Sequence, residues 1–366
     1  MGKVSDIGLI SADSHVNEPR DLWAKNLPAS MRDQAMKGIE HKGDGGWDLI
    51  LDGKPIAQTS MSEEERMAGM FPEKRFEVMR AEGIVGECVF PSIGLYVWML
   101  TDPEGGKISC RIYNDWVNDT LESKSRRFRC AGLVPTWNVD DALVEIEHIA
   151  SSGLAAFMIP AVTDPTYNHR QWEPMWHAME ETGLPVVVHQ GTGHSMIFYR
   201  GPGASVSNLL TTQSMAPRMT TLLATSGVLE RHPNLHFVFV EYNAGWMGWA
   251  MDTMDFYTES FSRYQLEKGG SWIYPELPEP PGFYVKRQVH ATFQKDWIGI
   301  RNLPVTGADS IMWGSDYPHE EGTYPHSRAV VDELAADLDA STANRVFRSA
   351  AADIFKFDQS VLTTPV

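Results

Sequence analysis

The sequence predicts a single (β/α)₈ barrel, and three features of the chain lead to this fold class. Eight short runs recur along the 366 residues, and most are almost continuously apolar, as expected of parallel strands that are covered on both faces. Segments with apolar residues at helical spacing lie between the runs, which favours a parallel sheet. Hydrophobic residues make up 43% of the chain, enough for one large core. We therefore expect one barrel domain over residues 1–366.

The predicted strands follow one another at fairly regular intervals. In chain order they are Ile7–Val16, Val85–Ser92, Cys130–Trp137, Ala155–Val162, Pro185–Gln190, His236–Tyr242, Val289–Gln294 and Ile311–Pro318. Eight strand–helix units predict the closed barrel rather than an open sheet.

Three helices have the clearest periodicity, namely Asp140–Ser151, Trp172–Thr182 and Ala216–Arg231. The last is followed by His232-Pro233, a helix-stop signal.

Two stretches do not fit a minimal barrel. Arg20–Arg75 is rich in Gly, Lys, Asp and Met and is expected to be an insertion over the barrel mouth. Phe261–Phe283 contains PELPEPPGF and is expected to lack regular structure, as an ordered loop or a subunit contact.

Composition excludes some classes of partner. The net charge is −17, so nucleic acid and anionic membrane surfaces would be repelled. Cys88, Cys110 and Cys130 form no CxxC pair, which favours a reducing compartment. The first residues do not resemble a signal peptide, and no run of about 18 apolar residues occurs. We expect a cytoplasmic protein.

The proline-rich Pro275–Pro281 and the many aromatic residues predict a homo- or hetero-oligomer.

Acidic and imidazole side chains stand at the ends of three predicted strands. Asp13 and His15 alternate on the first strand and so share a face, His189 ends the fifth strand, and Asp316 ends the eighth. In a barrel of this kind the chemistry lies at the C-terminal strand ends, so these four side chains should converge. Two carboxylates and two imidazoles suit Zn²⁺, Mn²⁺ or Fe²⁺ and leave positions for water or substrate.

Glu241 ends the sixth predicted strand, and three roles are open to it. It could act as general base toward a metal-bound water, it could be an extra ligand, or it could orient a ligand histidine.

Other histidines are candidates for moving a proton or touching the substrate. His319 directly follows the eighth strand, and His194 lies five residues past His189 in QGTGH; a loop histidine without a role is the alternative. His290, in the seventh strand, is expected to face the cavity. Solvent exposure is expected for His41, His148, His169, His177, His232 and His326.

Three residues are candidates for substrate binding. Arg200 could clamp a substrate carboxylate, although a surface salt bridge is the alternative. Tyr96 and Trp98 follow the second strand and would line the apolar wall of the pocket.

Three segments resemble the amidohydrolase superfamily: ISADSHVNEP, LPVVVHQGTGH and IMWGSDYPHEEGTYPHSR. The branch around aminocarboxymuconate-semialdehyde decarboxylase is the most similar, and the resemblance extends from about residue 8 to about residue 355. It implies a barrel with a metal site on the first, fifth and eighth strands, with Asp13, His15, His189 and Asp316 as ligands.

The sequence departs from the superfamily pattern at three places. Asp13 stands where a histidine is common, Glu241 ends a strand that often ends in histidine, and the fourth strand has no lysine for a bridging carbamate. Asp13 hardens the site toward Mn²⁺ or Fe²⁺. We expect one divalent ion, with a position near Glu241 for a second, but not a carbamate-bridged pair.

Three functions remain open at this point. The first is a metal-dependent hydrolase or decarboxylase acting on a small carboxylated or cyclic substrate. The second is an O₂-activating iron or manganese enzyme, similar to the subunits of 2-aminoisobutyrate monooxygenase. The third is a non-catalytic barrel in a hetero-oligomer.

Overall fold

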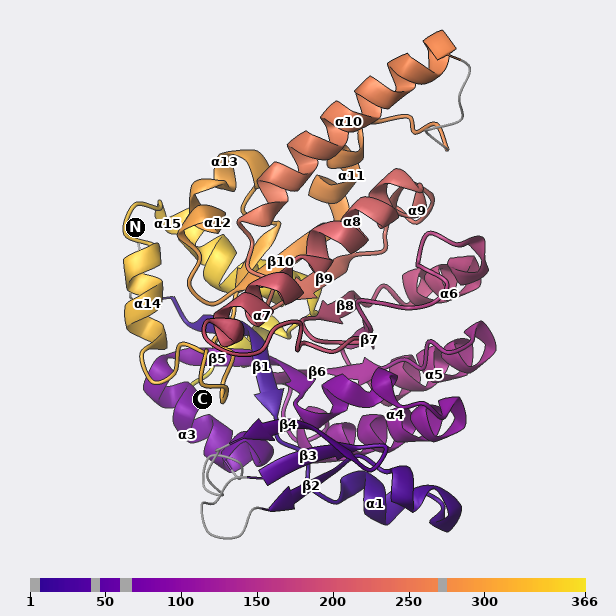
Figure 1. Cartoon of the computed structure of the whole chain (residues 1–366). Coiled ribbons are helices and arrows are strands. Elements are labelled where there is room, and N and C mark those ends of the chain that lie inside the picture. Colours follow the sequence, from indigo (N-terminus) through magenta and orange to yellow (C-terminus); the bar gives the residue numbers. More distant parts are fainter. Residues whose placement is uncertain (1–6, 41–46, 60–67, 269–274) are drawn as a thin grey trace.

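Eight parallel strands form the centre of the computed structural model, which describes residues 7–40, 47–59, 68–268 and 275–366 (Figure 1). Their spatial order is β1-β5-β6-β7-β8-β9-β10-β11, and helices lie between them along the chain. The strands are β1 (Leu9–Val16), β5 (Ile84–Pro91), β6 (Phe128–Leu133), β7 (Ala156–Ile159), β8 (Val186–His189), β9 (Phe237–Val240), β10 (Val289–Phe293) and β11 (Ile311–Trp313). The predicted (β/α)₈ barrel is confirmed, and each strand lies within a predicted run or starts within two residues of it.

The first and last strands are joined by the segment that follows β11. Ser14 pairs in parallel with Tyr317, whose carbonyl accepts a hydrogen bond from the His15 N–H at 2.7 Å. The Asp316 N–H donates to the Asp13 carbonyl at 2.8 Å. These bonds close the barrel at its C-terminal end and bring residues 13–15 beside residues 316–317.

The barrel strands are almost entirely buried, because helices cover the outside and side chains fill the inside. The helices are α1 (Leu22–Asn26), α3 (Pro72–Glu82), α4 (Pro103–Val117), α5 (Val139–Ser152), α6 (Glu173–Thr182), α7 (Ala204–Gln213), α8 (Met215–Thr225), α9 (Val228–Arg231), α10 (Trp246–Lys268), α11 (Pro281–Gln288), α12 (Trp297–Arg301), α13 (Leu303–Thr306), α14 (Ser327–Leu334), α15 (Ala340–Asn344), α16 (Ala350–Ile354) and α17 (Gln359–Leu362). Short 3₁₀ or π turns occupy η2 (Ala29–Gln34), η3 (Ile93–Met99), η4 (Asn118–Glu122), η5 (Arg170–Trp172) and η6 (Arg345–Ser349).

Two of the three predicted helices form nearly as expected. α5 begins where the Asn138 side chain accepts the Asp141 N–H, and α6 ends at Gly183 in the left-handed conformation. The prediction of one helix over Ala216–Arg231 is wrong. Gly227 has a φ of 78° there and separates α8 from α9, because a left-handed residue cannot continue a helix.

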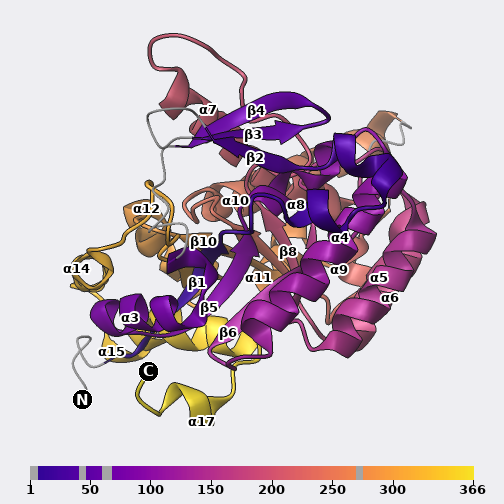
Figure 2. The same cartoon turned by 90° about the horizontal axis from the view of Figure 1, so that it is seen from below.

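The predicted insertion has its own secondary structure. After α1 and η2, an antiparallel sheet forms from β2 (Lys37–Glu40), β3 (Trp47–Leu51) and β4 (Lys54–Thr59), beyond the C-terminal end of β1 (Figure 2). Asp52, in the turn between β3 and β4, accepts hydrogen bonds from Thr101, which follows η3. The predicted end at Arg75 is wrong, since Pro72 already begins the helix that precedes β5.

The expectation of irregular structure over Phe261–Phe283 is only partly correct. α10 continues to Lys268 and projects away from the barrel (Figure 1), and Pro281 occupies the first turn of α11, where proline is tolerated. Residues 275–280 are irregular, as expected. Among the described residues, no helix is long and apolar enough to cross a membrane.

Candidate metal centre

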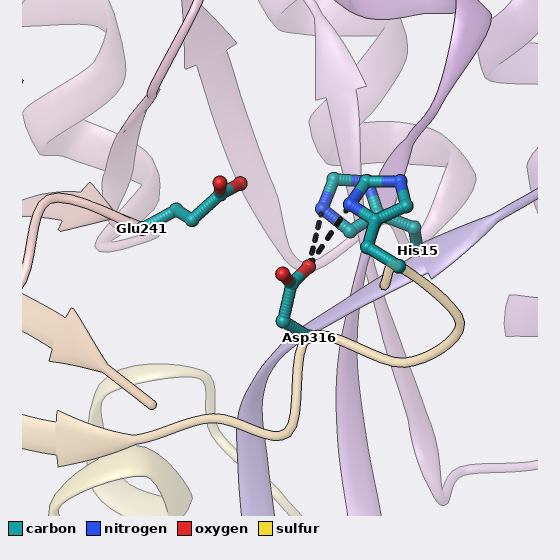
Figure 3. A group of neighbouring side chains, drawn as sticks. His15, Glu241 and Asp316 are labelled. Carbon is teal, nitrogen blue, oxygen red and sulfur yellow. Dashed lines mark ion pairs between the residues drawn. The ribbon is translucent and has the colours of Figure 1, made fainter. Parts of the chain in front are cut away.

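Asp13 and His15 point the same way from β1, as their alternation predicts. Both side chains are fully buried, and His15 Nε2 lies 3.6 Å from Asp13 Oδ1. His189, the last residue of β8, brings its Nε2 to 3.7 Å from the same oxygen. Asp316 follows β11 with a φ of 56°, and its Oδ1 lies 3.4 Å from His15 Nε2. The structure therefore brings all four predicted ligands together at the mouth. Figure 3 shows two of them, His15 and Asp316, side by side.

The two imidazoles are held so that their Nε2 atoms face each other. His15 Nδ1 lies 2.7 Å from the Pro91 carbonyl and His189 Nδ1 lies 3.0 Å from the Gln190 carbonyl, so both Nδ1 atoms carry the proton. Both Nε2 atoms then present lone pairs, 3.1 Å apart. Two facing lone pairs at this distance repel, and a cation between them removes the repulsion.

The carboxylates also lack donors. Among the described residues, Asp13 Oδ1 and both Asp316 oxygens are buried and accept no hydrogen bond. Burial, then the charges of Asp13 and Glu321, raise the pKa of Asp316. Burial, then His319 and His189, lower the pKa of His15. The shifts mean that burial disfavours the ionised form of Asp316 and the protonated form of His15. Both residues therefore fit a divalent cation, which stabilises carboxylates and takes neutral imidazoles as ligands.

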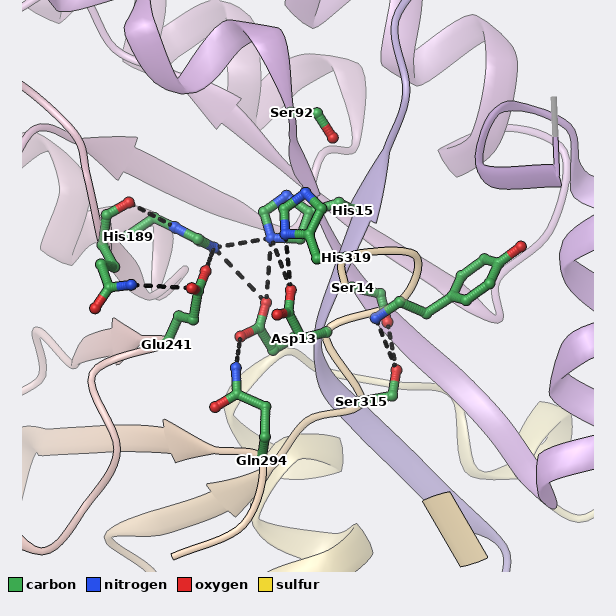
Figure 4. Close-up of polar contacts among 12 residues, drawn as sticks. Asp13, Ser14, His15, Ser92, His189, Glu241, Gln294, Ser315 and His319 are labelled. Atoms are coloured by element: carbon green, nitrogen blue, oxygen red, sulfur yellow. Dashed lines mark hydrogen bonds and ion pairs between the residues drawn. The ribbon is translucent and has the colours of Figure 1, made fainter. Parts of the chain in front are cut away.

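Glu241 lies beside His189, and His319 lies beside His15 (Figure 4). Glu241 has a φ of 67°, and its N–H donates to Thr292 Oγ1 at 2.8 Å. Its Oε2 lies 3.6 Å from His189 Nε2. His319 places Nδ1 3.0 Å from Asp316 Oδ1 and stacks on the His15 ring at 3.9 Å between centroids.

The four predicted ligands, Glu241 and His319 form two groups that share His15. Within each group the ligand atoms lie within 4.8 Å of one another. One group is Asp13, His15 and His189, and the other is His15, Glu241, Asp316 and His319. Burial, then Asp316 and Asp13, raise the pKa of Glu241, so this carboxyl also holds its proton more tightly than usual.

Three residues near the centre were missed by the sequence analysis. Gln190 donates from Nε2 to Glu241 Oε1 at 3.0 Å, and Gln294 donates to Asp13 Oδ2 at 3.3 Å. Glu321 raises the pKa values of Glu241 and Asp316. The rule that strand ends carry the chemistry could have found Gln190 and Gln294, since each ends a predicted strand.

Tyr96, Trp98 and Arg200 were predicted to bind the substrate. Burial, then the charges of Glu241 and Glu321, raise the pKa of Tyr96 to about 12. Trp98 donates its indole N–H to the Val134 carbonyl at 2.9 Å, at the end of β6. Arg200 is exposed in the loop after β8, and its role remains a prediction.

His194 lies in the same loop, with its ring 5.9 Å from that of Phe198. Its Nδ1 is 2.9 Å from the Ser195 carbonyl, and its role also remains a prediction.

Three histidines, His290, His232 and His148, differ from expectation. His290 does not face the mouth, because it is the second residue of β10 and pairs with His236 and the Asp309 carbonyl at the opposite end of the barrel. His232 is buried between Glu173 and Glu180, whose carboxylates satisfy both ring nitrogens. His148 is half-buried, His169, His177 and His326 are exposed as expected, and His41 lies outside the described residues.

Fold and site together define a barrel with a metal-binding donor set at its mouth. The chain belongs to the amidohydrolase family, whose model, described as Amidohydrolase, matches residues 12–357. Comparison with curated proteins finds no match.

Several solved structures share the fold. An amidohydrolase from Mycobacterium avium subsp. paratuberculosis K-10 is 16% identical with a TM-score of 0.80, covering 96% of this chain and 99% of that one. 5-Carboxyvanillate decarboxylase from Novosphingobium aromaticivorans, complexed with manganese and 4-hydroxy-3-methoxy-5-nitrobenzoic acid, is 18% identical with a TM-score of 0.71, covering 97% and 98%. 2,6-Dihydroxybenzoate decarboxylase from Rhizobium is 16% identical with a TM-score of 0.66, covering 96% and 99%.

Proposed function

We propose that this protein is a metal-dependent decarboxylase of small carboxylated aromatic compounds that carry a hydroxyl beside the carboxylate. The observation that carries the proposal is the convergence at the barrel mouth of two inward-facing Nε2 atoms and three carboxylate oxygens that accept no hydrogen bond from the described residues. Two of the similar structures are decarboxylases of hydroxylated aromatic acids, which supports the substrate class.

Asp13, His15, His189 and Asp316 would hold the cation. When bound, the cation would hold the substrate carboxylate and the neighbouring hydroxyl oxygen as a Lewis acid, while a proton added to the ring carbon takes the place of the departing CO₂. Manganese is the proposed metal, because carboxylate-rich sites favour hard ions and a similar structure contains manganese.

The chain's own groups would orient the ring. Tyr96 and Trp98, both in η3, would form the wall against which an aromatic ring packs. Glu241 and His319 would face the substrate from the open side, where each would move a proton or ligate a cation.

The test is CO₂ release from a panel of hydroxybenzoates by protein loaded with Mn²⁺, Zn²⁺ or Fe²⁺. We expect turnover with Mn²⁺, loss of turnover after chelation, and recovery on adding metal back. A parallel panel of amides, esters and lactones measures hydrolysis, the runner-up activity that the family name favours. Hydrolysis without CO₂ release, or CO₂ release that survives chelation, would contradict the proposal.

The O₂-activating alternative gains no support from the similar structures described above, which are named as an amidohydrolase and two decarboxylases. The cytoplasmic location, the single-domain organisation and the homo- or hetero-oligomeric state stay predictions.

A further inference from the structure

Glu18 is a buried acid close to the metal centre, and the proposed chemistry does not use it. It lies two residues past the end of β1 and three residues after His15, and only 1% of its surface is exposed. Burial raises the pKa of this carboxyl to about 7, although hydrogen bonds from backbone N–H groups oppose the shift. An acid is costly to bury at such a place, so its hydrogen-bond partners indicate what it does.

The partners of Glu18 are three consecutive backbone N–H groups at the start of η3. Ile93 and Ser92 donate to Oε2 at 2.9 and 3.3 Å, and Gly94 donates to Oε1 at 2.9 Å. The first N–H groups of a helix have no partner within the helix, and the side chain of the N-cap residue, Ser92, makes no capping bond here. Glu18 therefore caps η3 from the end of a different strand.

This contact extends the pairing of β1 and β5 beyond the sheet. The two strands are parallel neighbours (Figure 2), and their backbone pairing ends at Val16 and Pro91. Just past this point, the Asn17 Oδ1 accepts a hydrogen bond from the Ser92 hydroxyl at 3.1 Å, and Glu18 accepts the N–H groups that follow. Side chains thus replace backbone pairing where the two chains leave the barrel.

The beginning of the segment held by Glu18 contacts a proposed metal ligand. The Pro91 carbonyl lies 2.7 Å from His15 Nδ1 and so orients the ring with its Nε2 toward His189. Pro91 immediately precedes the three residues that donate to Glu18. A shift of this turn would therefore turn or release the His15 imidazole.

The rest of the segment provides the proposed wall of the pocket. Tyr96 and Trp98 both lie in η3, and Trp98 donates its indole N–H to the Val134 carbonyl at 2.9 Å. η3 is therefore anchored near its C-terminal end by Trp98 and at its N-terminal end by Glu18.

Gly94 allows η3 to approach the carboxylate closely. A Cβ at this position would lie 3.1 Å from Glu18 Oε1 and 2.8 Å from the Pro91 Cβ. Both distances are shorter than ordinary van der Waals contact, so a larger residue would push the turn away from Glu18. A change of either Glu18 or Gly94 should therefore move η3.

We propose that Glu18 is a positioning residue of the metal centre. By binding the first N–H groups of η3, it fixes the Pro91 carbonyl that orients His15. Through the same contact it fixes the wall that Tyr96 and Trp98 provide. The effect on the wall rests on the proposed function, whereas the effect on His15 rests only on metal binding at the mouth.

The experiment compares Glu18→Gln with a matched control, Glu122→Gln, in the full chain. Glutamine keeps the volume of Glu18, but its Nε2 would face N–H groups that need an acceptor, so the contact with η3 is weakened. Glu122 is also buried, burial also raises its pKa to about 7, and it accepts the Cys130 N–H. It ends η4, which precedes β6, and so lies toward the end of the barrel opposite the mouth.

Two measurements accompany urea unfolding, and neither needs turnover. Mn²⁺ affinity is obtained from the electron paramagnetic resonance signal of free Mn²⁺. Metal-free protein containing 5-fluorotryptophan gives a ¹⁹F spectrum, in which the Trp98 line is identified by its loss in Trp98→Phe. Both glutamine variants should lose stability. Only Glu18→Gln should shift the Trp98 line and weaken Mn²⁺ binding, by about 10-fold, as for loss of a group that orients a metal ligand.

Gly94→Ala provides a second variant in which the carboxylate is intact. It should also shift the Trp98 line and weaken Mn²⁺ binding, and it decides the question if Glu18→Gln does not fold. An unchanged Mn²⁺ affinity or an unchanged Trp98 line in the folded variant would overturn the proposal. Equal changes in Glu122→Gln would do the same, because they would reflect lost stability alone.

The two hypotheses fail separately. Weaker Mn²⁺ binding and a shifted Trp98 line in Glu18→Gln, in a protein that releases CO₂ from no aromatic acid, would keep the role of Glu18 and remove the proposed function. CO₂ release by the unmodified chain, with Mn²⁺ affinity and the Trp98 line unaltered in Glu18→Gln, would keep the proposed function and remove the role of Glu18.

Discussion

Replacement of Asp316 by asparagine tests the metal centre with the least change of shape. The side chain keeps its size, and the bond from the residue 316 N–H to the Asp13 carbonyl is a backbone bond that the change does not remove. The Asp316 carboxylate accepts no hydrogen bond from the described residues, so Asp316→Asn breaks none in the metal-free protein. The metal-free variant should be as stable as the unmodified chain, or more stable by up to about 2 kcal/mol, because a buried carboxyl that accepts no hydrogen bond from the described residues is removed.

Metal binding should respond in the opposite direction. Loss of an outer contact to a ligand typically weakens metal affinity by about 10–100-fold, so loss of a charged ligand should cost at least about 100-fold. At free Mn²⁺ of about 100 times the dissociation constant, binding stabilises the unmodified chain by about 2.7 kcal/mol. The same concentration would add only about 0.4 kcal/mol to Asp316→Asn.

The assay is urea unfolding of both proteins in chelator and in buffered Mn²⁺, with Asp332→Asn on the exposed face of α14 as the matched control. If Asp316→Asn keeps the full metal-induced stabilisation, Asp316 is not a ligand and the site is misplaced. If the metal-free variant unfolds, the residue has a structural role that its missing hydrogen bonds do not indicate.

Other predictions concern the fold, the pocket and the assembly. Burial, then His236, lowers the pKa of His290 to about 4, so its contribution to stability is complete above the unfolded value of about 6.5 and is lost as the pH falls toward 4. The loss should reach about 3 kcal/mol of unfolding free energy. His290→Gln should flatten the dependence of the unfolding free energy on pH over this range, whereas the control His177→Gln, at an exposed histidine, should not. Gly193→Ala should destabilise by about 1–3 kcal/mol in denaturant unfolding, because φ is +76° and a Cβ would lie 2.6 Å from a backbone oxygen; Gly203→Ala, with φ of +78° and open space, should lose less. Tyr96→Ala should raise KM more than it lowers kcat in steady-state assays, since the ring is proposed to pack on substrate; an unchanged KM would remove it from the pocket wall. Light scattering at micromolar concentration should find an oligomer, because α10 exposes aromatic residues such as Tyr257; a monomer would refute this.

The strands and their order were predictable because burial of a parallel strand requires a nearly continuous apolar run. VVVH in β8 and FVFV in β9 meet this requirement directly, and the polar residue that ends each run could be assigned to the mouth. The convergence of the four proposed ligands was predictable for the same reason, since the strand direction fixes the end at which they meet.

Elements held by tertiary contacts could not be predicted in this way. β2 and β4 are short and contain Gly, Lys and Pro, so their pairing depends on β3 rather than on local preference. The left-handed conformations of Asp316 and Glu241 are equally absent from local preference, because a non-glycine residue adopts φ near +60° only where its surroundings impose it. These two conformations aim the carboxylates, so the sequence identified the residues but not their geometry.

The hydrogen bonds that close the barrel between residues 13–15 and residues 316–317 have a consequence for synthesis of the protein. Asp13 and His15 emerge early from the ribosome, whereas Asp316 and the Tyr317 carbonyl, which hold the first strand in place, arrive about 300 residues later. A nascent chain that stops short of β11 has an open edge at β1 and lacks a carboxylate of the donor set. If the donor set binds a cation as proposed, capture of that cation is tied to completion of the chain, and a cell's metal supply acts on finished barrels rather than on fragments.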